Sequence, residues 1–267
     1  MKKTTAILLV LITAINSYAQ SNSWQWAQKI EALNEARAFI TVAPSGETYV
    51  AGHFEWGQVV LDSITLTAST LSLNIFFAKY NANGAILWAK KVSQGLNDNS
   101  GTYVHAMTTD QNLNFYVTGA YYGSIYFDST LVTCPACGPA GTAVFTAKYD
   151  STGNLLWVKT GNGTTNQEVN TGISVAADTA GNCYVTGLFD GTTLFDTVAL
   201  TSAGIAAGGD DAFIAKYNST GNLMWAKRAG SPSADNGNCI RVDNQSNIYV
   251  CGNFDNTISF DSITLNG

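Results

Sequence analysis

The sequence predicts an all-β fold, a β-propeller built from four-stranded antiparallel blades, and three observations lead to that prediction. A Tyr-Val-x-Gly phrase recurs with a period of about 65–69 residues, at Tyr49, Tyr116, Tyr184 and Tyr249. An Ala-Lys-Tyr phrase keeps step with it and is followed each time by a tryptophan, at Trp88, Trp157 and Trp225. Only 12% of residues are charged, whereas the chain holds 25 Gly, 12 Tyr and 12 Phe. Repeats of this kind bury their cores against their neighbours.

The third copy shows the strands of one repeat most clearly. Residues 173–177 alternate between apolar and polar positions, and 183–189 return after the turn 178–182 as the partner strand. A second hairpin follows, with strands 212–217 and 223–227 around the turn 218–222. Glycine at the fourth position of these turns suits a residue with positive φ. Four antiparallel strands with even spacing and one tryptophan per repeat are typical of a propeller blade.

Each repeat is longer than a four-stranded blade requires. Such a blade needs only about 40–50 residues, which leaves a surplus of about 20. The surplus falls between the second and third strands, where an apolar-Asp pair recurs at Leu61-Asp62, Phe127-Asp128, Phe195-Asp196 and Phe260-Asp261. We therefore expect a small extra hairpin on one face of each blade.

The repeat resembles a known family on two stretches of the third copy. These are Asp178 to Gly187, which ends in Tyr-Val-Thr-Gly, and Asp211 to Lys227, which contains Ala-Lys-Tyr and Gly-Asn-Leu-Met-Trp-Ala-Lys. They are similar to the bacterial SBBP, or seven-bladed, β-propeller repeats, and the resemblance covers nearly all of the chain after its first 19 residues. It implies a secreted or surface propeller and, in many members, a C-terminal domain for type IX secretion. It implies no catalytic residues.

The first 19 residues read as a secretory signal peptide. Lys2 and Lys3 precede an apolar run, 6–12, and the small residues Ser17 and Ala19 suit cleavage near Ala19. The apolar run is shorter than the roughly 20 residues that span a bilayer. We therefore expect a secreted or cell-surface protein without a membrane span, whose mature part is 20–267.

The mature chain divides into a leading strand and four repeats, the last of them incomplete. We place a leading outer strand at 24–30, blades at 31–92, 93–160 and 161–229, and a partial fourth blade at 230–267. The fourth copy lacks counterparts of strands 213–217 and 223–227, and the leading strand supplies only a fourth strand, not a third. The chain is therefore expected to be a fragment whose remaining blades lie elsewhere in the same protein. A complete propeller of about four blades is the alternative.

Five cysteines in a secreted chain raise the question of disulfides. Cys239 and Cys251 flank the turn 243–247, and a hairpin centred on Gln245 sets them directly opposite each other, so a cross-strand disulfide is expected. The alternatives are two buried free thiols, or a register slip that turns the two side chains to opposite faces of the hairpin. Cys134 and Cys137 have the spacing of zinc and redox motifs, but the missing further ligands favour a loop disulfide.

No metal or cofactor site emerges from the remaining motifs. His53 and His105 occupy positions that hold other residues in the other copies, which favours two unrelated strand or surface histidines over a shared metal ligand. Asp110, Asp178 and Asp243 lie in turns that offer too few oxygens for calcium, and hydrogen bonds to the turn explain them better. The Gly-Asn-Leu-x-Trp phrase also resembles the tryptophan-docking blades of quinoprotein dehydrogenases, where tryptophan fixes one blade to the next.

The residues favour binding over catalysis. A formal net charge of −6 argues against nucleic acid as a partner, and no catalytic set of residues and no cofactor is predicted. We expect a secreted, non-catalytic scaffold that binds an extracellular protein or glycan. Trp56, Tyr121 and Tyr122 are candidates for facing the ligand, although aromatic residues in such strands are usually core. The alternative is a propeller enzyme, a quinoprotein-like oxidoreductase or a lyase, with its site at the central channel.

Overall fold

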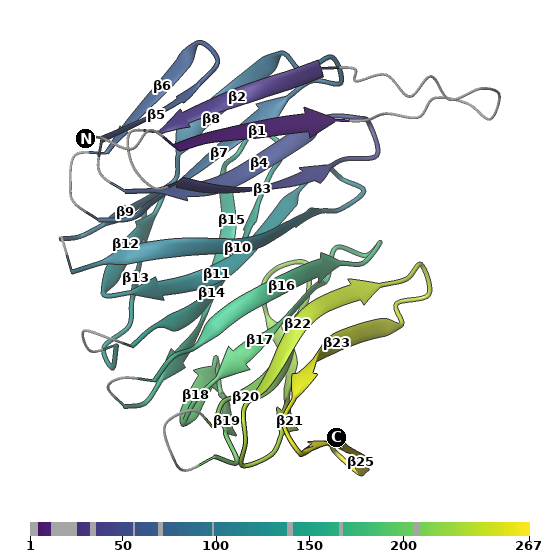
Figure 1. Cartoon of the computed structure of the whole chain (residues 1–267). Helices are drawn as coiled ribbons and strands as arrows, with labels where there is room; N and C mark the ends of the chain where they lie inside the picture. Colours follow the sequence, from purple (N-terminus) through teal and green to yellow (C-terminus); the bar gives the residue numbers. More distant parts are fainter. Residues whose placement is uncertain are drawn as a thin grey trace.

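The computed structural model of the chain is built from β-strands that form antiparallel sheets (Figure 1). It describes residues 5–11, 26–32, 36–55, 57–68, 72–97, 99–137, 141–165, 168–204 and 209–267. Within these ranges no helix is long and apolar enough to cross a membrane. The expectation of an all-β fold is confirmed for the described residues.

Each of the first three repeats contributes four strands that pair in chain order, as the sequence predicts. In the first repeat these are β3 (Ala36–Val42), β4 (Thr48–Phe54), β7 (Asn74–Tyr80) and β8 (Ile86–Lys91). In the second they are β10 (Gly101–Thr109), β11 (Phe115–Tyr122), β14 (Ala143–Tyr149) and β15 (Leu155–Gly163). In the third they are β16 (Thr171–Ala177), β17 (Cys183–Phe189), β20 (Asp211–Tyr217) and β21 (Leu223–Gly230). The fourth contributes β22 (Asp235–Val242) and β23 (Ile248–Phe254).

The extra hairpin is present in every repeat, but its position differs from the expectation. The hairpins are β5 (Gly57–Leu61) with β6 (Ile64–Ala68), β12 (Ser124–Phe127) with β13 (Thr130–Thr133), β18 (Thr192–Phe195) with β19 (Val198–Thr201), and β24 (Thr257–Phe260) with β25 (Ile263–Asn266). Instead of lying on a face of its own blade, β18 pairs with β15 and β24 pairs with β21. In the same way, β12 pairs with β9 (Ser93–Gly95), just after β8.

The prediction of four-stranded blades is therefore incomplete. The second and third repeats form six-stranded sheets, each with four strands of its own and two from the hairpin of the next repeat. The edge of an outer strand exposes unpaired N–H and C=O groups. The borrowed hairpin pairs with the last residues of that edge, Gly161–Gly163 of β15 and Ala229–Gly230 of β21. Successive repeats are thereby interlocked through backbone hydrogen bonds as well as side chains.

The recurring aspartate of the hairpin makes its turn and aligns it with the preceding repeat. Asp62, Asp128, Asp196 and Asp261 have φ between 46° and 52°, a left-handed conformation that a short polar side chain tolerates. Asp128 lies 3.5 Å from Nζ of Lys90, and Asp196 lies 3.1 Å from Nζ of Lys159, and each lysine is on the fourth strand of the preceding repeat. Exposed ion pairs add little stability, so their main effect is on the register.

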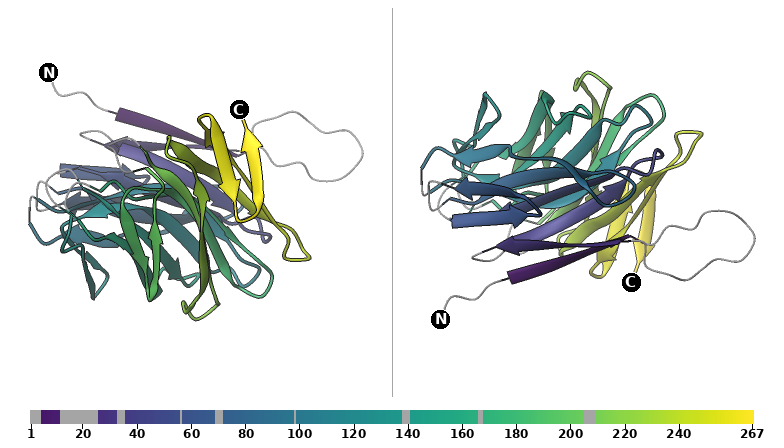
Figure 2. Two further views of the ribbon diagram at one scale, coloured as in Figure 1. Left: turned by 90° about the horizontal axis from the view of Figure 1, so that it is seen from below. Right: turned by 90° about the horizontal axis from the view of Figure 1, so that it is seen from above.

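The first strands of neighbouring repeats lie next to one another, so that β10 contacts both β3 and β16, and β16 contacts β22. The sheets follow each other in chain order from β1 to β25 (Figure 1), and strands of adjacent sheets are rotated relative to one another (Figure 2). The glycine of Tyr-Val-x-Gly lies against the first strand of its own repeat. A Cβ there would lie within 2 Å of a backbone carbonyl oxygen at Gly119, Gly187 and Gly252.

The lysine of Ala-Lys-Tyr packs on the tyrosine of Tyr-Val-x-Gly. Nζ of Lys148 lies 5.0 Å from the ring centre of Tyr116, and the same contact joins Lys79 to Tyr49 and Lys216 to Tyr184. A cation over an aromatic face is favourable, and more so where the pair is buried. The two repeated phrases thus form one contact across the second and third strands.

Tryptophan residues fix each repeat to the next, as the resemblance to docking blades implies. A Cβ on Gly221, Gly153 or Gly84 would lie within about 3 Å of the ring of Trp157, Trp88 or Trp26, respectively. Nε1 of Trp157 donates a hydrogen bond to the carbonyl of Ser219 at 3.2 Å. Each ring therefore lies over a turn glycine of the following repeat.

The leading strand predicted at 24–30 corresponds to β2 (Trp26–Ala32). Trp26 donates to the carbonyl of Ala82, and β2 pairs with β5, so β2 occupies the position of an outer strand. On its other edge β2 pairs with β1 (Thr5–Leu11), which lies where a third strand would be. The strand predicted at 24–30 therefore takes an outer position, as expected, and the strand on its other edge comes from the predicted signal peptide. Cleavage near Ala19 would remove β1 and leave this edge of β2 unpaired.

Candidate functional site

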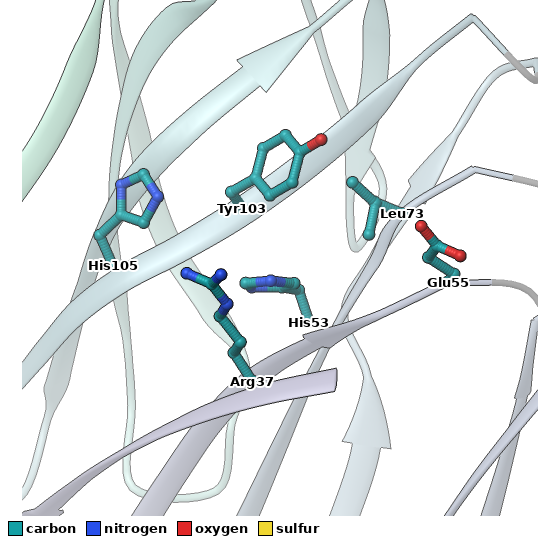
Figure 3. A pocket seen from close by; sticks show the side chains of 6 residues that line it. All are labelled: Arg37, His53, Glu55, Leu73, Tyr103 and His105. Atoms are coloured by element: carbon teal, nitrogen blue, oxygen red, sulfur yellow. The ribbon is translucent and has the colours of Figure 1, made fainter. Parts of the chain in front are cut away.

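A cavity of about 190 Å³ lies where the first repeat meets the second. It is formed by β3 and β4 of the first repeat and β10 of the second, and Figure 3 shows the side chains around it. Its lining consists of Arg37, His53, Glu55, Leu73, Tyr103 and His105. Arg37 is exposed, whereas His53 is only 5% exposed, so the cavity runs inward from the arginine.

The sheet register sets the positions of the polar side chains. Arg37 on β3 is directly opposite His53 on β4. Tyr103 and His105 flank Val104 on β10, and the Val104 N–H donates to Nδ1 of His53 at 3.2 Å. His105 is the extra residue of a β-bulge, because the pairing with β11 shifts between Val104 and Ala106. The Arg37, His53 and His105 side chains face a common space (Figure 3).

Hydrogen bonds to the backbone fix opposite tautomers for the two neutral histidine rings. Nδ1 of His53 accepts a hydrogen bond, so the proton is on Nε2, which is a donor. Nδ1 of His105 lies 3.1 Å from the carbonyl oxygen of Gly172, which only accepts, so Nδ1 carries the proton and Nε2 is an acceptor. Besides the carboxyl group of Glu55, the cavity therefore combines one permanent cation, one neutral N–H donor and one nitrogen acceptor.

Burial keeps both rings neutral at pH 7. Burial, followed by the charges of His105 and Arg37, lowers the pKa of His53 to about 4. Burial also lowers the pKa of His105, an effect partly offset by its hydrogen bond to Gly172 and reinforced by Arg37. The charged form of each ring is disfavoured because the surroundings are poor in water and already positive.

We predict that His53 makes the folded chain sensitive to acid. Its folded pKa of about 4 lies below the value of 6.5 for an unperturbed ring, so its contribution to stability is complete above pH 6.5 and is lost as the pH falls toward 4. Between pH 7 and pH 5 the loss amounts to about 2 kcal/mol. His53→Asn retains an acceptor for the Val104 N–H but does not titrate.

Urea unfolding of both proteins at pH 7 and pH 5 measures this contribution. The free energy of unfolding should fall by about 2 kcal/mol more in the parent protein than in His53→Asn. An equal change in both proteins would show that His53 titrates alike in the folded and unfolded states.

The two histidines of the cavity lie at positions where the other repeats have different residues. The counterparts of His53 are Ala120, Leu188 and Asn253, and those of His105 in the later bulges are Ile173 and Asn238. The interpretation of the two histidines as unrelated is therefore wrong, since β4 and β10 bring both to one cavity. No motif assigned a role to Arg37, Glu55, Leu73 or Tyr103. A comparison of equivalent repeat positions singles out Arg37, whose counterparts are Tyr103, Thr171 and Asn236, but not Glu55, which has Asp190 and Asp255 at its position in the third and fourth repeats.

The site lacks the features of a metal centre. Among the residues that the structure describes, no group of three or more His, Cys, Asp or Glu side chains is placed to hold a metal ion. The guanidinium of Arg37 also opposes a bound cation in this cavity. The arrangement instead favours a ligand that accepts hydrogen bonds at one end and donates them at the other.

The turn aspartates bond to their own turns, as the hydrogen-bonding interpretation predicts. Oδ1 of Asp178 accepts from the N–H groups of Ala180 and Asn182 at 3.0 and 2.9 Å, and Oδ2 accepts from Oη of Tyr184 at 3.0 Å. Burial alone would raise the pKa of Asp178, but these hydrogen bonds lower it. The carboxylates at Asp110 and Asp243 make the same contacts.

The three aromatic candidates for facing a ligand have different environments. Tyr121 is fully buried, and its hydroxyl donates to Asn162 at 2.7 Å, so it belongs to the core and not to a ligand surface. Tyr122 is partly buried and packs beside the cavity residue Tyr103, with ring centres 6.3 Å apart. Trp56 lies outside the described residues.

The cysteines agree with the predicted geometry. Cys134 and Cys137 form the loop disulfide expected from the sequence, with Cα atoms 5.3 Å apart. Cys239 and Cys251 are directly opposite in the β22–β23 pairing, but they are free thiols in the structure, as is the buried Cys183. The cross-strand disulfide remains a prediction.

We predict that Cys239 and Cys251 join on mild oxidation. Opposed residues of antiparallel strands have Cβ atoms about 4.5–5.5 Å apart, close to the separation that a disulfide needs. Mass spectrometry of a proteolytic digest after treatment with oxidised glutathione should show the two peptides linked. Glutathione attached to each thiol separately would contradict the prediction, and Cys251→Ser is the control.

Comparison with known proteins supports the repeat architecture. No family model matches the chain. The chain is 26% identical over 209 residues to an uncharacterised WD repeat-containing protein, L264, of Acanthamoeba polyphaga mimivirus. The match covers 68% of this chain but only 14% of the relative, so the chain spans a small part of that protein's length. A relative named for its WD repeats and an all-strand repeat fold fit a β-propeller in general.

Proposed function

We propose that this chain is part of a secreted or cell-surface β-propeller, of the SBBP type that its sequence resembles, and that it is a non-catalytic scaffold for binding a protein or glycan. The observation that carries the proposal is the cavity between the first two repeats, where residues that depart from the repeat pattern gather. Antiparallel sheets hold Arg37, His53, Tyr103 and His105 on strands, which makes this part of the site rigid before a ligand arrives.

Two further observations support a binding scaffold. The WD repeats in the name of the mimivirus relative are the kind of repeat that builds propellers. The signal-like first 19 residues support export, and in that setting glycans and extracellular proteins are the available ligands.

The proposal is tested with the purified chain on arrays of glycans and extracellular proteins. We expect one ligand class to bind the parent chain and to be lost in the double variant His53→Asn, His105→Asn, which carries the residues that the fourth repeat has at these positions. The matched control is Asn238→Ala, Asn253→Ala in the fourth repeat, which should bind like the parent chain.

Two results would contradict the proposal. Equal binding by the parent and the double variant would exclude the cavity as the site. Mass spectrometry should show the bound ligand unchanged after incubation, and a cleaved ligand would contradict the non-catalytic role. Export is tested separately, because the mature protein recovered from the medium should begin after Ala19.

A further inference from the structure

We propose, on the basis of the binding function above, that the cavity binds a carboxylate-bearing sugar unit, a uronic acid of an acidic glycan. In this arrangement the guanidinium of Arg37 and Nε2–H of His53 hold the carboxylate. The other end of the cavity receives the hydroxyl groups of the same sugar ring.

The donors in the cavity match a carboxylate. Arg37 presents a planar fork of N–H groups at the mouth, and His53 adds Nε2–H from the buried side. A carboxylate only accepts hydrogen bonds, and it is planar like the fork. The single negative charge of a carboxylate meets less repulsion from Glu55 and from a chain of net charge −6 than the double charge of a phosphate does.

The acceptors in the cavity match hydroxyl groups. Nε2 of His105 is an acceptor because Nδ1 carries the ring proton, and the carboxylate of Glu55 lies beside Leu73, away from His105 (Figure 3). An apolar acid such as a fatty acid would leave both acceptors without donors, which is costly for partly buried groups. The ring of Tyr103 offers a flat apolar surface between these two ends.

The size of the cavity limits the ligand to one small unit. Its volume of about 190 Å³ is below the roughly 300 Å³ at which pockets for drug-sized ligands begin. A single sugar ring with a carboxylate is of suitable size, and the exposed position of Arg37 leaves room for a chain to continue into solvent. An end unit or a side-chain unit of a glycan meets both conditions.

Titration calorimetry of the full chain at pH 7 tests the proposal, with sodium D-galacturonate, sodium D-glucuronate, D-galactose and sodium acetate as probes. We expect one of the uronates to bind at least about tenfold more tightly than both galactose and acetate. Arg37→Gln should weaken that binding by about 10-fold to 100-fold, since it removes a charge-assisted pair. The control Arg241→Gln, on β22 and outside the cavity lining, should leave binding unchanged.

The outcomes of this titration separate the inference from the proposed function. Binding of galactose as tight as that of the uronates, or unchanged uronate binding in Arg37→Gln, would overturn the carboxylate assignment. Acetate binding as tightly as both uronates would overturn the sugar assignment. Failure of every probe would overturn the inference. The binding scaffold would still stand if the arrays showed a ligand that is lost in the double histidine variant.

Discussion

Gly187→Ala should unfold the third repeat, with a loss of about 3 kcal/mol or more in the free energy of unfolding. A Cβ at Gly187 would lie 1.9 Å from the carbonyl oxygen of Thr171 and 3.0 Å from the ring of Phe213. The nearer atom belongs to the backbone of the paired strand β16, so no side-chain rotation relieves the contact. The strands must separate, and the loss should appear as a shift of the urea midpoint measured by tryptophan fluorescence.

Gly181→Ala provides a matched control in the turn of the same repeat. Gly181 has a φ of +77°, but a Cβ added there would lie 3.5 Å from its nearest neighbours. The substitution therefore costs only the conformational penalty of a left-handed residue, about 1–2 kcal/mol. Equal losses for the two variants would show that the strands β16 and β17 are not as close at Gly187 as the structure has them.

Trp157→Ala should uncouple the second repeat from the third and cost about 3–5 kcal/mol. The ring covers Gly221 and packs near the rings of Tyr217 and Tyr116, with centres 5.9 and 6.1 Å away. Its removal leaves a void between two sheets that rely on each other for their cores. Circular dichroism during urea unfolding should show a lower midpoint, or two transitions in place of one.

Two further variants separate the causes of this loss. Trp157→Phe retains most of the ring but loses the hydrogen bond from Nε1 to the carbonyl of Ser219, so it should cost about 1–2 kcal/mol. Leu156→Ala changes the neighbouring residue, whose side chain is 51% exposed, and should cost little. A loss for Leu156→Ala as large as that for Trp157→Ala would contradict the docking role of the tryptophan.

Local sequence signals predicted most of the strands, because each strand and turn is encoded by its own residues. The turn 178–182, the alternation in 173–177 and the Phe-Asp pairs each mark a hairpin without reference to the rest of the chain. Local signals do not encode which strand the extra hairpin pairs with, so this pairing was not predicted. Pairing of β18 with β15 depends on which sheet edge is open nearby, and the contact of Asp196 with Lys159 that aligns the two strands is not visible in a single sequence.

The site was harder to predict than the fold. His53 and His105 are 52 positions apart and lie in different repeats, so only the packing of β10 against β3 and β4 brings them together. The Tyr121 hypothesis failed because neighbouring residues of a strand point to opposite faces, and the face of Tyr121 is core. Departures from a repeat pattern at equivalent positions were the available signal for Arg37 and the two histidines.

The repeat scaffold brings His53 and His105 into one cavity and fixes the two neutral rings in opposite tautomers. Because the chain has only two histidines, a ¹⁵N NMR titration of the imidazole nitrogens measures these tautomers directly. We predict that near pH 7 one ring carries its proton on Nε2 and the other on Nδ1, and that His53 titrates with a pKa of about 4. Two rings in the same mixture of tautomers, both titrating near pH 6.5, would contradict the account.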